Sequence, residues 1–313
     1  MSAQSVSSLG QRFSLGLDSF SYYLHWRYDN QAIDTLLDRV TALDLTALQI
    51  NINGPNHRAL SGSTTEHFRS VGSRAAELGI ALEIASGGTD PSKMLLVLEM
   101  ARNLDADVVR TTIDERGDDI GATLKQQAAR ISLVAEQYEA ADVSLAVENH
   151  EDLTASELVE LLQLVDSPAV GAVFDSGNSI PFYQDPIEEA RLLAPHARTT
   201  HIKDHVLVRD NDGEVWSTGV ALGSGRIPLT EIVEVLAAAP HLERLMIQVC
   251  YGYATKMPKP PQCVPDMPLY EIITTPEDTG IRLPSQEVTQ DVLETAARHV
   301  ESSVEFMREL TTE

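Results

Sequence analysis

Three stretches of sequence decide the fold: SLAVENH at residues 144–150, GAVFDSGN at 171–178 and THIKDH at 200–205. Each is an apolar run that ends in polar side chains, and a helix-like pattern separates one run from the next. Short β-rich runs that alternate with helices are typical of a parallel sheet. This part of the chain therefore has the pattern of an α/β fold.

The same alternation extends over the whole chain, where eight such runs can be counted. Eight repeats of a strand–helix unit predict a (β/α)8 TIM barrel, and α/β barrels of this length form one domain. We therefore expect residues 1–313 to be a single domain. The eight runs are residues 13–20, 45–52, 81–86, 107–113, 144–150, 170–178, 199–208 and 244–250.

Helix starts are marked by capping residues. Ser63 with Glu66, and Thr154 with Glu157, have the spacing of capping boxes, in which two side chains satisfy free backbone N–H groups. Asp90 and Asp185, each followed by a proline, are predicted to cap two further helices. Thr230 is expected to open the seventh helix. These signals predict helices between the β-rich runs.

The segment after the eighth run breaks this rhythm. From Tyr251 to Pro284 the chain has seven prolines and no helical periodicity. Loops of this length are usually functional or disordered. We expect residues 251–286 to lie over the C-terminal mouth of the barrel as a lid or partner-docking loop, with a flexible excursion as the alternative. Residues 287–311 are predicted to form a C-terminal helix.

The composition limits the classes of partner. The chain has 23 Lys and Arg against 47 Asp and Glu, for a net charge of −24. This argues against binding nucleic acid or an anionic membrane through a basic patch. Cys250 and Cys263 form no disulfide framework, and we find neither a signal peptide nor a membrane-spanning run. We expect a cytoplasmic protein that forms an oligomer and acts on a small molecule.

A metal-capable side chain stands at the end of three consecutive strands: Glu148, Asp175 and His201. Barrel active sites form at the C-terminal strand ends, and neighbouring strands lie ~4.8 Å apart, so these side chains can converge on one ion. Two carboxylates and an imidazole suit Mn²⁺, Mg²⁺, Co²⁺ or Zn²⁺. The alternative is that each side chain only caps its strand or bonds a loop.

Side chains two residues apart on a strand share a face, which predicts the neighbours of this trio. His150 shares the face of Glu148 and would move a proton near neutral pH, or else only orient Glu148. Lys203 shares the face of His201, and either has a depressed pKa or binds a substrate oxygen. The further substrate-binding candidates are Gln248, Asn178, His25, Trp26, Arg226 and His205.

The chain resembles the xylose-isomerase-like superfamily of sugar isomerases and epimerases. The resemblance is carried by the motifs VENH, FDSGN and HIKDH, followed by LGSGRI at residues 222–227. The resemblance covers about residues 13–311. It implies one divalent ion, Mn²⁺ foremost, held by Glu148, Asp175 and His201 with a fourth carboxylate. It also implies removal of a proton next to a carbonyl, with the ion stabilising the enediolate.

The eighth strand departs from the epimerase pattern. Epimerases carry a glutamate there, whereas LMIQVCYGY at residues 245–253 offers Gln248. An amide is a neutral, weaker ligand and cannot act as a proton-transfer base. We favour Glu287, at the start of the last helix, as the fourth ligand, with Gln248 as the alternative. After the fourth strand, Asp114 and Glu115 are poor counterparts of the epimerases' second catalytic glutamate.

The chain resembles one branch of this superfamily in three features: the glutamine on the eighth strand, the proline-rich loop and a ligand on the last helix. This branch contains the α subunits of C-glycoside deglycosidases and the 3-oxo-isoapionate decarboxylases. This resemblance implies a lyase that cleaves the C1 bond of a 3-oxo-glycoside through an enolate. His150 would be the base, Lys203 would polarise an oxygen, and a small β-rich partner subunit would dock on the proline-rich loop. The alternatives are a sugar isomerase or epimerase, a keto-sugar-acid decarboxylase, and a non-catalytic metal- or sugar-binding subunit.

Overall fold

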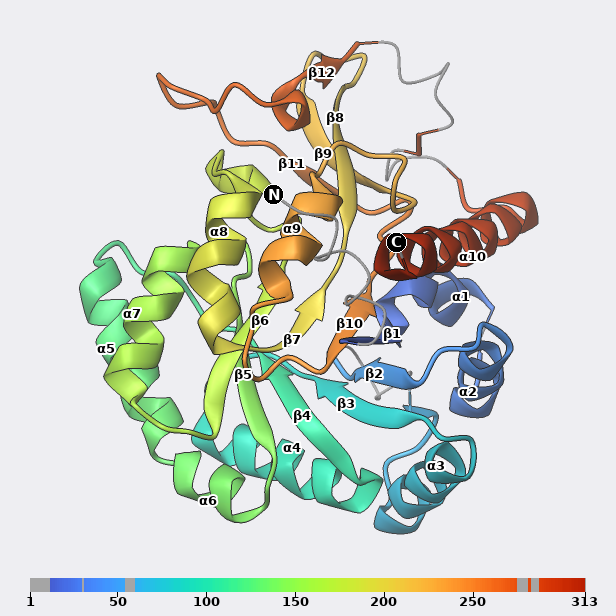
Figure 1. Cartoon of the computed structure of the whole chain (residues 1–313), viewed down its shortest axis with the longest axis vertical. Helices are drawn as coiled ribbons and strands as arrows, with labels where there is room; N and C mark the ends of the chain where they lie inside the picture. The colour runs from blue at the N-terminus through green and yellow to red at the C-terminus, as the bar shows by residue number, and fades with distance from the viewer. Residues whose placement is uncertain (1–11, 30, 54–59, 275–280, 283–286, 313) are drawn as a thin grey trace.

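Eight parallel strands form the barrel that the sequence predicts (Figure 1). The computed structural model describes residues 12–29, 31–53, 60–274, 281–282 and 287–312. The sheet order is β10-β1-β2-β3-β4-β5-β6-β7. The strands are β1 (Ser14–Asp18), β2 (Ala47–Asn51), β3 (Ala81–Ala85), β4 (Ala106–Thr111), β5 (Ser144–Glu148), β6 (Val170–Asp175), β7 (Ala197–His201) and β10 (Arg244–Ile247).

The ring is completed where β7 meets β10. The N–H of Ile202 donates to the carbonyl of Met246 at 2.8 Å, and the N–H of Gln248 donates to the carbonyl of Ile202 at 3.0 Å. This short contact brings the end of β7 beside the end of β10, and therefore brings His201 and Gln248 to the same mouth of the barrel.

Helices surround the strands on the outside of the barrel (Figure 1). The short 3-10 helices are η2 (Ser19–Tyr22), η4 (Ile180–Phe182), η5 (Ala194–His196) and η6 (Pro268–Tyr270). The α-helices are α1 (Tyr23–Tyr28), α2 (Ile33–Ala42), α3 (Thr65–Glu77), α4 (Pro91–Leu104), α5 (Ile120–Ser132), α6 (Ala135–Ala140), α7 (Ala155–Val165), α8 (Pro186–Leu193), α9 (Leu229–Leu236) and α10 (Gln290–Thr312).

The helix starts agree with the sequence in three of five cases. Asp90 and Asp185 cap α4 and α8 ahead of a proline, as predicted. The capping box of Thr154 and Glu157 is present at α7. At α3 the cap is Thr64, whose hydroxyl accepts from the N–H of His67, so the prediction of Ser63 was wrong by one residue. Helix α9 begins at Leu229, ahead of the predicted Thr230. Adjacent hydroxyl side chains make the register of a cap ambiguous in sequence, because either can accept from the first turn.

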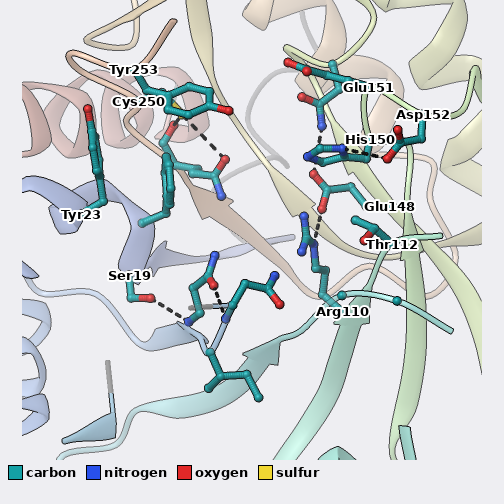
Figure 2. Close-up of a pocket in the computed structure, with 18 of the residues that line it drawn as sticks. Ser19, Tyr23, Arg110, Thr112, Glu148, His150, Glu151, Asp152, Cys250 and Tyr253 are labelled. Carbon is teal, nitrogen blue, oxygen red and sulfur yellow. Dashed lines mark hydrogen bonds and ion pairs between the residues drawn. The ribbon is translucent and has the colours of Figure 1, made fainter. Parts of the chain in front are cut away.

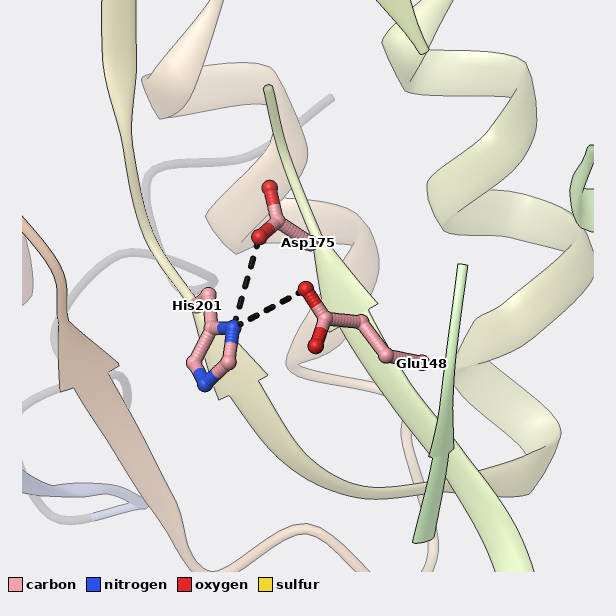
Figure 3. Close-up of side chains that lie close together, drawn as sticks. All are labelled: Glu148, Asp175 and His201. Carbon is pink, nitrogen blue, oxygen red and sulfur yellow. Dashed lines mark hydrogen bonds and ion pairs between the residues drawn. The ribbon is translucent and has the colours of Figure 1, made fainter. Parts of the chain in front are cut away.

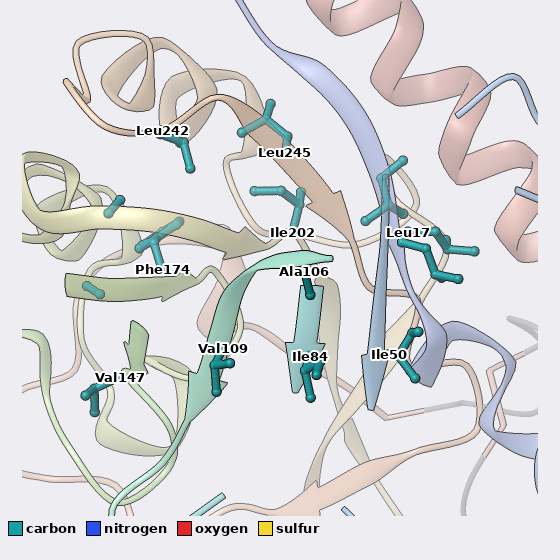
Figure 4. Close-up of a cluster of buried hydrophobic side chains, with 14 of the residues drawn as sticks. Leu17, Ile50, Ile84, Ala106, Val109, Val147, Phe174, Ile202, Leu242 and Leu245 are labelled. Atoms are coloured by element: carbon teal, nitrogen blue, oxygen red, sulfur yellow. The ribbon is translucent and has the colours of Figure 1, made fainter. Parts of the chain in front are cut away.

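The two faces of the strands carry different side chains. Outward-facing residues such as Leu17 and Phe174 pack in the large core between strands and helices (Figure 4). Burying such a side chain contributes about 1.5–3 kcal/mol. Inside the barrel, Val108, Ala146 and Val173 form a small separate apolar cluster. Many of the other side chains inside the barrel are polar, and the candidate site is built from them.

A second sheet stands beyond the barrel, and the sequence did not predict it. Its order is β11-β9-β8-β12, from β8 (Asp204–Arg209), β9 (Val215–Val220), β11 (Ala254–Lys256) and β12 (Ile272–Ile273). The predicted seventh strand at residues 199–208 is therefore two strands. The backbone leaves the barrel at Lys203, whose N–H donates to the hydroxyl of Ser176 at 2.8 Å. In sequence, His201, Lys203 and His205 stand two residues apart and are followed by the apolar run Val206–Val208, so residues 199–208 read as one strand.

The proline-rich segment is more ordered than the sequence predicts over its described part. It supplies β11, η6 and β12, and it is fastened to the rest of the chain by side chains. The hydroxyl of Tyr183 donates to the carbonyl of Pro258 at 2.8 Å, and Arg226 donates to the carbonyls of Pro268 and Glu271 at 3.2 and 2.9 Å. Its role as a lid or docking loop stays a prediction. Within the described residues, no helix has the length and apolar character needed to cross a membrane.

Candidate metal centre and pocket

Three predicted ligands meet at the carboxyl ends of β5, β6 and β7 (Figure 3). The Nδ1 atom of His201 lies 3.3 Å from Oε1 of Glu148 and 3.3 Å from Oδ2 of Asp175. All three side chains are buried. The strand ends therefore place two carboxylates and one imidazole nitrogen around a single point, as the sequence predicts.

The spacing of these atoms fits a divalent ion. One potential ligand atom from each residue lies within 4.8 Å of the others. Ligand atoms bonded at about 2.0–2.2 Å to one ion lie roughly 3.0–3.5 Å apart in octahedral or tetrahedral geometry. Two buried carboxylates so close together repel each other unless positive charge is nearby. The donor set therefore suits Mn²⁺, Mg²⁺ or Zn²⁺.

Arg110, on β4, pairs with the other oxygen of Glu148 and was not predicted from the sequence. Its Nε atom contacts Oε2 of Glu148, and its Nη1 donates to the carbonyl of Ser86 at 2.6 Å. Burial alone would raise the pKa of Glu148, but the guanidinium of Arg110 and the ring of His201 hold this pKa well below its usual range. Glu148 is therefore a poor proton acceptor.

Asp175 is fixed by its own backbone and by Lys203. Its N–H donates to the side-chain oxygen of Asn149 at 2.7 Å, and Nζ of Lys203 lies 2.7 Å from Oδ2 of Asp175. Burial would lower the pKa of Lys203, but the attraction of Asp175 outweighs it and raises the pKa above its ordinary value. In the metal-free chain Lys203 is therefore a protonated hydrogen-bond donor, and its role beside a bound ion stays a prediction.

Asn178 links the two ion pairs. Its amide nitrogen donates to Oε1 of Glu148 at 2.9 Å, and its amide oxygen accepts from Lys203 at 3.3 Å. Asn178 therefore holds one predicted ligand and the lysine in fixed positions, instead of only forming a turn.

Asp18 and Gln248 lie on the opposite side of His201 from Asp175. Oδ2 of Asp18, at the end of β1, lies 3.5 Å from Nε2 of His201. Burial raises the pKa of Asp18, while His201 and a hydrogen bond from Gln248 act to lower it. Asp18 was not predicted from the sequence as part of the site, although it ends an apolar strand in the same way as Asp175.

Glu148 connects the triad to a cavity of about 990 Å³, which it lines, whereas the buried Asp175 and His201 are not part of the cavity lining (Figure 2). Glu148, Lys203, Asn178 and Gln248 line its polar side. Another part of the cavity is lined by an aromatic wall, which consists of the rings of Phe20, Tyr23, Trp26 and Tyr253. Within it, Phe20 and Tyr23 stack with ring centroids 4.8 Å apart. The cavity therefore has one face for oxygen atoms and another for an apolar or aromatic group.

His150 lies at the rim of this cavity beside Glu148 (Figure 2). Its Nδ1 atom lies 3.4 Å from Oδ2 of Asp152. Burial lowers the pKa of His150, but Asp152 and Glu148 together raise it above its ordinary value. A carboxylate on one ring nitrogen makes the imidazole a better base and leaves the other nitrogen for the cavity.

Four predicted residues lie apart from the triad. His25 packs on Tyr22 with ring centroids 5.2 Å apart, and His205 contacts the hydroxyl of Ser217 at 3.0 Å; neither lines the cavity. Arg226 binds the proline-rich segment. Glu287 is exposed and precedes α10, which begins three residues later than predicted, so it does not fit the role of fourth ligand. Of the predicted aromatic residues, Trp26 does line the cavity.

The LGSGRI motif has a structural explanation. The carboxylate of Asp204 accepts from the N–H groups of Gly223, Gly225 and Ile227 at 3.0, 2.8 and 3.1 Å. A Cβ on Gly225 would lie 2.0 Å from Oδ1 of Asp204, so only glycine fits at this position. The motif therefore shapes the turn after the second sheet.

Metal binding should depend on pH through His201. Burial lowers the pKa of this imidazole, but Glu148 and Asp175 raise it to about 9. Nδ1 must lose its proton to bind an ion, so we expect Mn²⁺ affinity to rise about tenfold per pH unit between about pH 7 and 8. Calorimetry in buffers of different ionisation enthalpy should detect about one proton released. Affinity independent of pH would contradict this assignment.

The raised pKa of His201 also contributes to the pH dependence of the stability of the metal-free protein. Because the folded pKa of about 9 lies above the ordinary value of 6.5, protonation of His201 stabilises the fold. This contribution is complete below pH 6.5 and is lost as the pH rises through 9.

Comparisons with known proteins agree with this architecture. A family model described as a xylose isomerase-like TIM barrel matches residues 13–246. The 3-oxo-isoapionate decarboxylase of Pectobacterium atrosepticum is 25% identical over 219 residues, which cover 68% of this chain and 76% of that protein.

Solved structures share the fold at low sequence identity. D-Psicose 3-epimerase from Clostridium cellulolyticum H10, solved with D-tagatose, superposes with a TM-score of 0.67 at 16% identity, covering 96% of this chain and 99% of the epimerase. The IolI protein, solved with a zinc atom, gives a TM-score of 0.64 at 13% identity, covering 94% and 99% of the two chains.

Proposed function

The chain belongs to the xylose isomerase-like TIM barrel family, and from this we propose that it is a divalent-metal-dependent lyase acting on a 3-oxo sugar through an enolate. The observation that carries the proposal is the distribution of proton-transfer groups around the triad. Sugar epimerisation needs a group on each face of the reacting carbon. Here Gln248 is an amide, and Arg110 holds the pKa of Glu148 well below its usual range. The His150–Asp152 pair is the better base, which favours removal of one proton followed by bond cleavage.

The reaction that fits this arrangement begins at C2 of a 3-oxo-glycoside. His150 removes the C2 proton, and its electron pair forms a C2–C3 double bond with negative charge on the C3 oxygen. The C3 carbonyl then re-forms, a C1–C2 double bond forms, and the C1–aglycone bond breaks. The departing aglycone carbon takes its proton from His150. The products are the free aglycone and a 1,2-unsaturated 3-oxo sugar.

Residues around the cavity would position this substrate. Glu148, Asp175 and His201 would hold the ion, and a bound ion would supply positive charge to stabilise the developing charge on the C3 oxygen. Lys203 is protonated and would donate to a sugar oxygen. The aromatic wall offers Tyr23 and Tyr253 as stacking surfaces for an aromatic aglycone.

Decarboxylation of a keto-sugar acid is the second candidate. The similarity to a 3-oxo-isoapionate decarboxylase supports it. The cations Arg110 and Lys203, which line the cavity, also support it. They pair with Glu148 and Asp175, and a bound ion would neutralise part of the charge of these two carboxylates. Arg110 and Lys203 would then attract the carboxylate of the substrate. In a β-keto acid, the carboxylate is attached to the carbon adjacent to the keto carbon. It would leave as CO₂, and the electron pair of the broken C–C bond would form the same kind of enolate.

We infer that Mn²⁺ is the resident ion, because an oxygen-rich donor set with one imidazole suits it. We also propose that residues 1–313 act as one domain in a cytoplasmic oligomer. A small β-rich partner subunit would dock on the proline-rich segment, where the second sheet offers strand edges.

The reaction test uses metal-free protein with and without added Mn²⁺. We expect about one ion per chain after loading. An aryl C-glycoside oxidised at C3 should release its aglycone only with the ion, and its C2 hydrogen should exchange in deuterated water. Release of CO₂ from a keto-sugar acid would support the second candidate. Interconversion of keto sugars without bond cleavage, or no exchange at C2 of any substrate, would contradict the proposal.

A further inference from the structure

The side chain of Gln49 joins the triad to the interior of the barrel. Gln49 stands on β2 and is fully buried, with its Oε1 atom 2.6 Å from Nε2 of His201. Its own Nε2 atom donates to Oε2 of Glu83, on β3, at 2.8 Å. The hydroxyl of Thr199 donates to the same carboxylate oxygen at 2.8 Å. A chain of hydrogen bonds therefore runs from His201 to Glu83.

Glu83 sets the direction of every bond in this chain. Its Oε2 atom accepts from both Gln49 and Thr199, and Nη1 of Arg244 lies 3.6 Å from Oε1. Gln49 must therefore turn its NH₂ group to Glu83 and its oxygen to His201. An amide oxygen only accepts, so the hydrogen of the short contact belongs to Nε2 of His201.

We propose that Gln49, oriented by Glu83, is a positioning residue that keeps His201 protonated at Nε2 and thereby leaves the Nδ1 lone pair for a divalent ion. Nδ1 is the atom that faces both Glu148 and Asp175. A partner on the second nitrogen fixes the ring orientation and makes the first nitrogen a better ligand. The inference rests on the proposed metal centre but not on the proposed reaction, since ion affinity is measured without substrate.

The test compares Mn²⁺ affinity and the state of His201 in four proteins. Gln49→Met keeps the volume of the side chain but removes the acceptor, so the dissociation constant should rise by about 10- to 100-fold. In the double exchange Gln49→Glu with Glu83→Gln, position 49 still offers an oxygen that accepts from His201. One amide still donates between positions 49 and 83, and the total charge is unchanged. It should restore affinity to within roughly threefold. Gln127→Met, a buried amide on α5 bonded to Thr89, is the matched control and should bind as the wild type does.

Nitrogen NMR of the Zn²⁺-loaded proteins supplies a readout that packing alone would not change. We expect a directly bonded hydrogen on Nε2 of His201 in the wild type and in the double exchange, and its loss or rapid solvent exchange in Gln49→Met. If Gln49→Met does not fold, Gln49→Asn, whose shorter side chain withdraws the oxygen, replaces it. Wild-type affinity and Nε2 protonation in a folded Gln49 variant would overturn the inference, as would a folded double exchange that binds no better than Gln49→Met. Ion binding without turnover in the wild type would instead count against the proposed function.

Discussion

Replacing Asp175 by asparagine should leave the purified protein with little bound ion and reduce turnover by roughly 10³-fold or more. The substitution keeps the shape of the side chain and removes its negative charge. A divalent ion contributes several kcal/mol to stabilising a developing oxyanion, and each ~1.4 kcal/mol corresponds to a factor of ten in rate. Elemental analysis under non-chelating conditions and the aglycone-release assay measure the two effects.

A matched carboxylate provides the control for this variant. Glu287→Gln removes one negative charge from an exposed position outside the triad and should keep wild-type ion content and turnover. Asp175→Asn also leaves Lys203 without its ionic partner, so its thermal unfolding must be measured alongside. A folded Asp175→Asn protein that retains ion and activity would show that the triad is not the metal centre. Loss of the ion in Glu287→Gln would restore the predicted ligand role of Glu287.

His150→Gln should reduce kcat by about 10²- to 10⁴-fold while the ion stays bound. Glutamine can occupy the rim of the cavity but cannot accept the C2 proton. The expected signature is therefore a loss of both aglycone release and C2 hydrogen exchange at unchanged metal content. His241→Gln, at an exposed histidine outside the cavity, is the control and should have wild-type kinetics.

The partner carboxylate makes this prediction specific to proton transfer. Because Asp152 helps to raise the pKa of His150, Asp152→Asn should lower it and extend activity toward more acidic pH. A base must be unprotonated to act, so the acidic limb of the kcat/KM profile should move to lower pH. A fall of less than about threefold in His150→Gln, or an unmoved profile in Asp152→Asn, would assign the proton transfer to another residue.

The barrel and the triad were predictable because both depend on local patterns. Apolar runs alternating with helices specify parallel strands, and parallel strands end at the same mouth. Glu148, Asp175 and His201 each end such a run, on neighbouring strands, so their convergence follows from the topology. Asp18 and Arg110 carry the same signal at the ends of β1 and β4. The pattern alone did not indicate that these two also reach the centre.

The sequence also misplaced residues where the chain departs from the repeat. The alternation from His201 through Lys203 to His205 is continuous in sequence, yet the chain leaves the barrel at Lys203. His205 therefore joins the second sheet and lies outside the cavity. Glu287 resembled a ligand because it stood near a helix start, but α10 begins at Gln290 and Glu287 is exposed.

By itself, then, the sequence determined the strand–helix repeat and the three side chains that end β5, β6 and β7. Only the tertiary structure decided which partners these side chains have. Arg110 contacts Glu148, and Gln49 reaches His201 from a strand 152 residues away in sequence. The physical reason is that strand-end chemistry follows from periodicity within a strand, whereas contacts across the barrel depend on how the ring closes and on where the backbone leaves it.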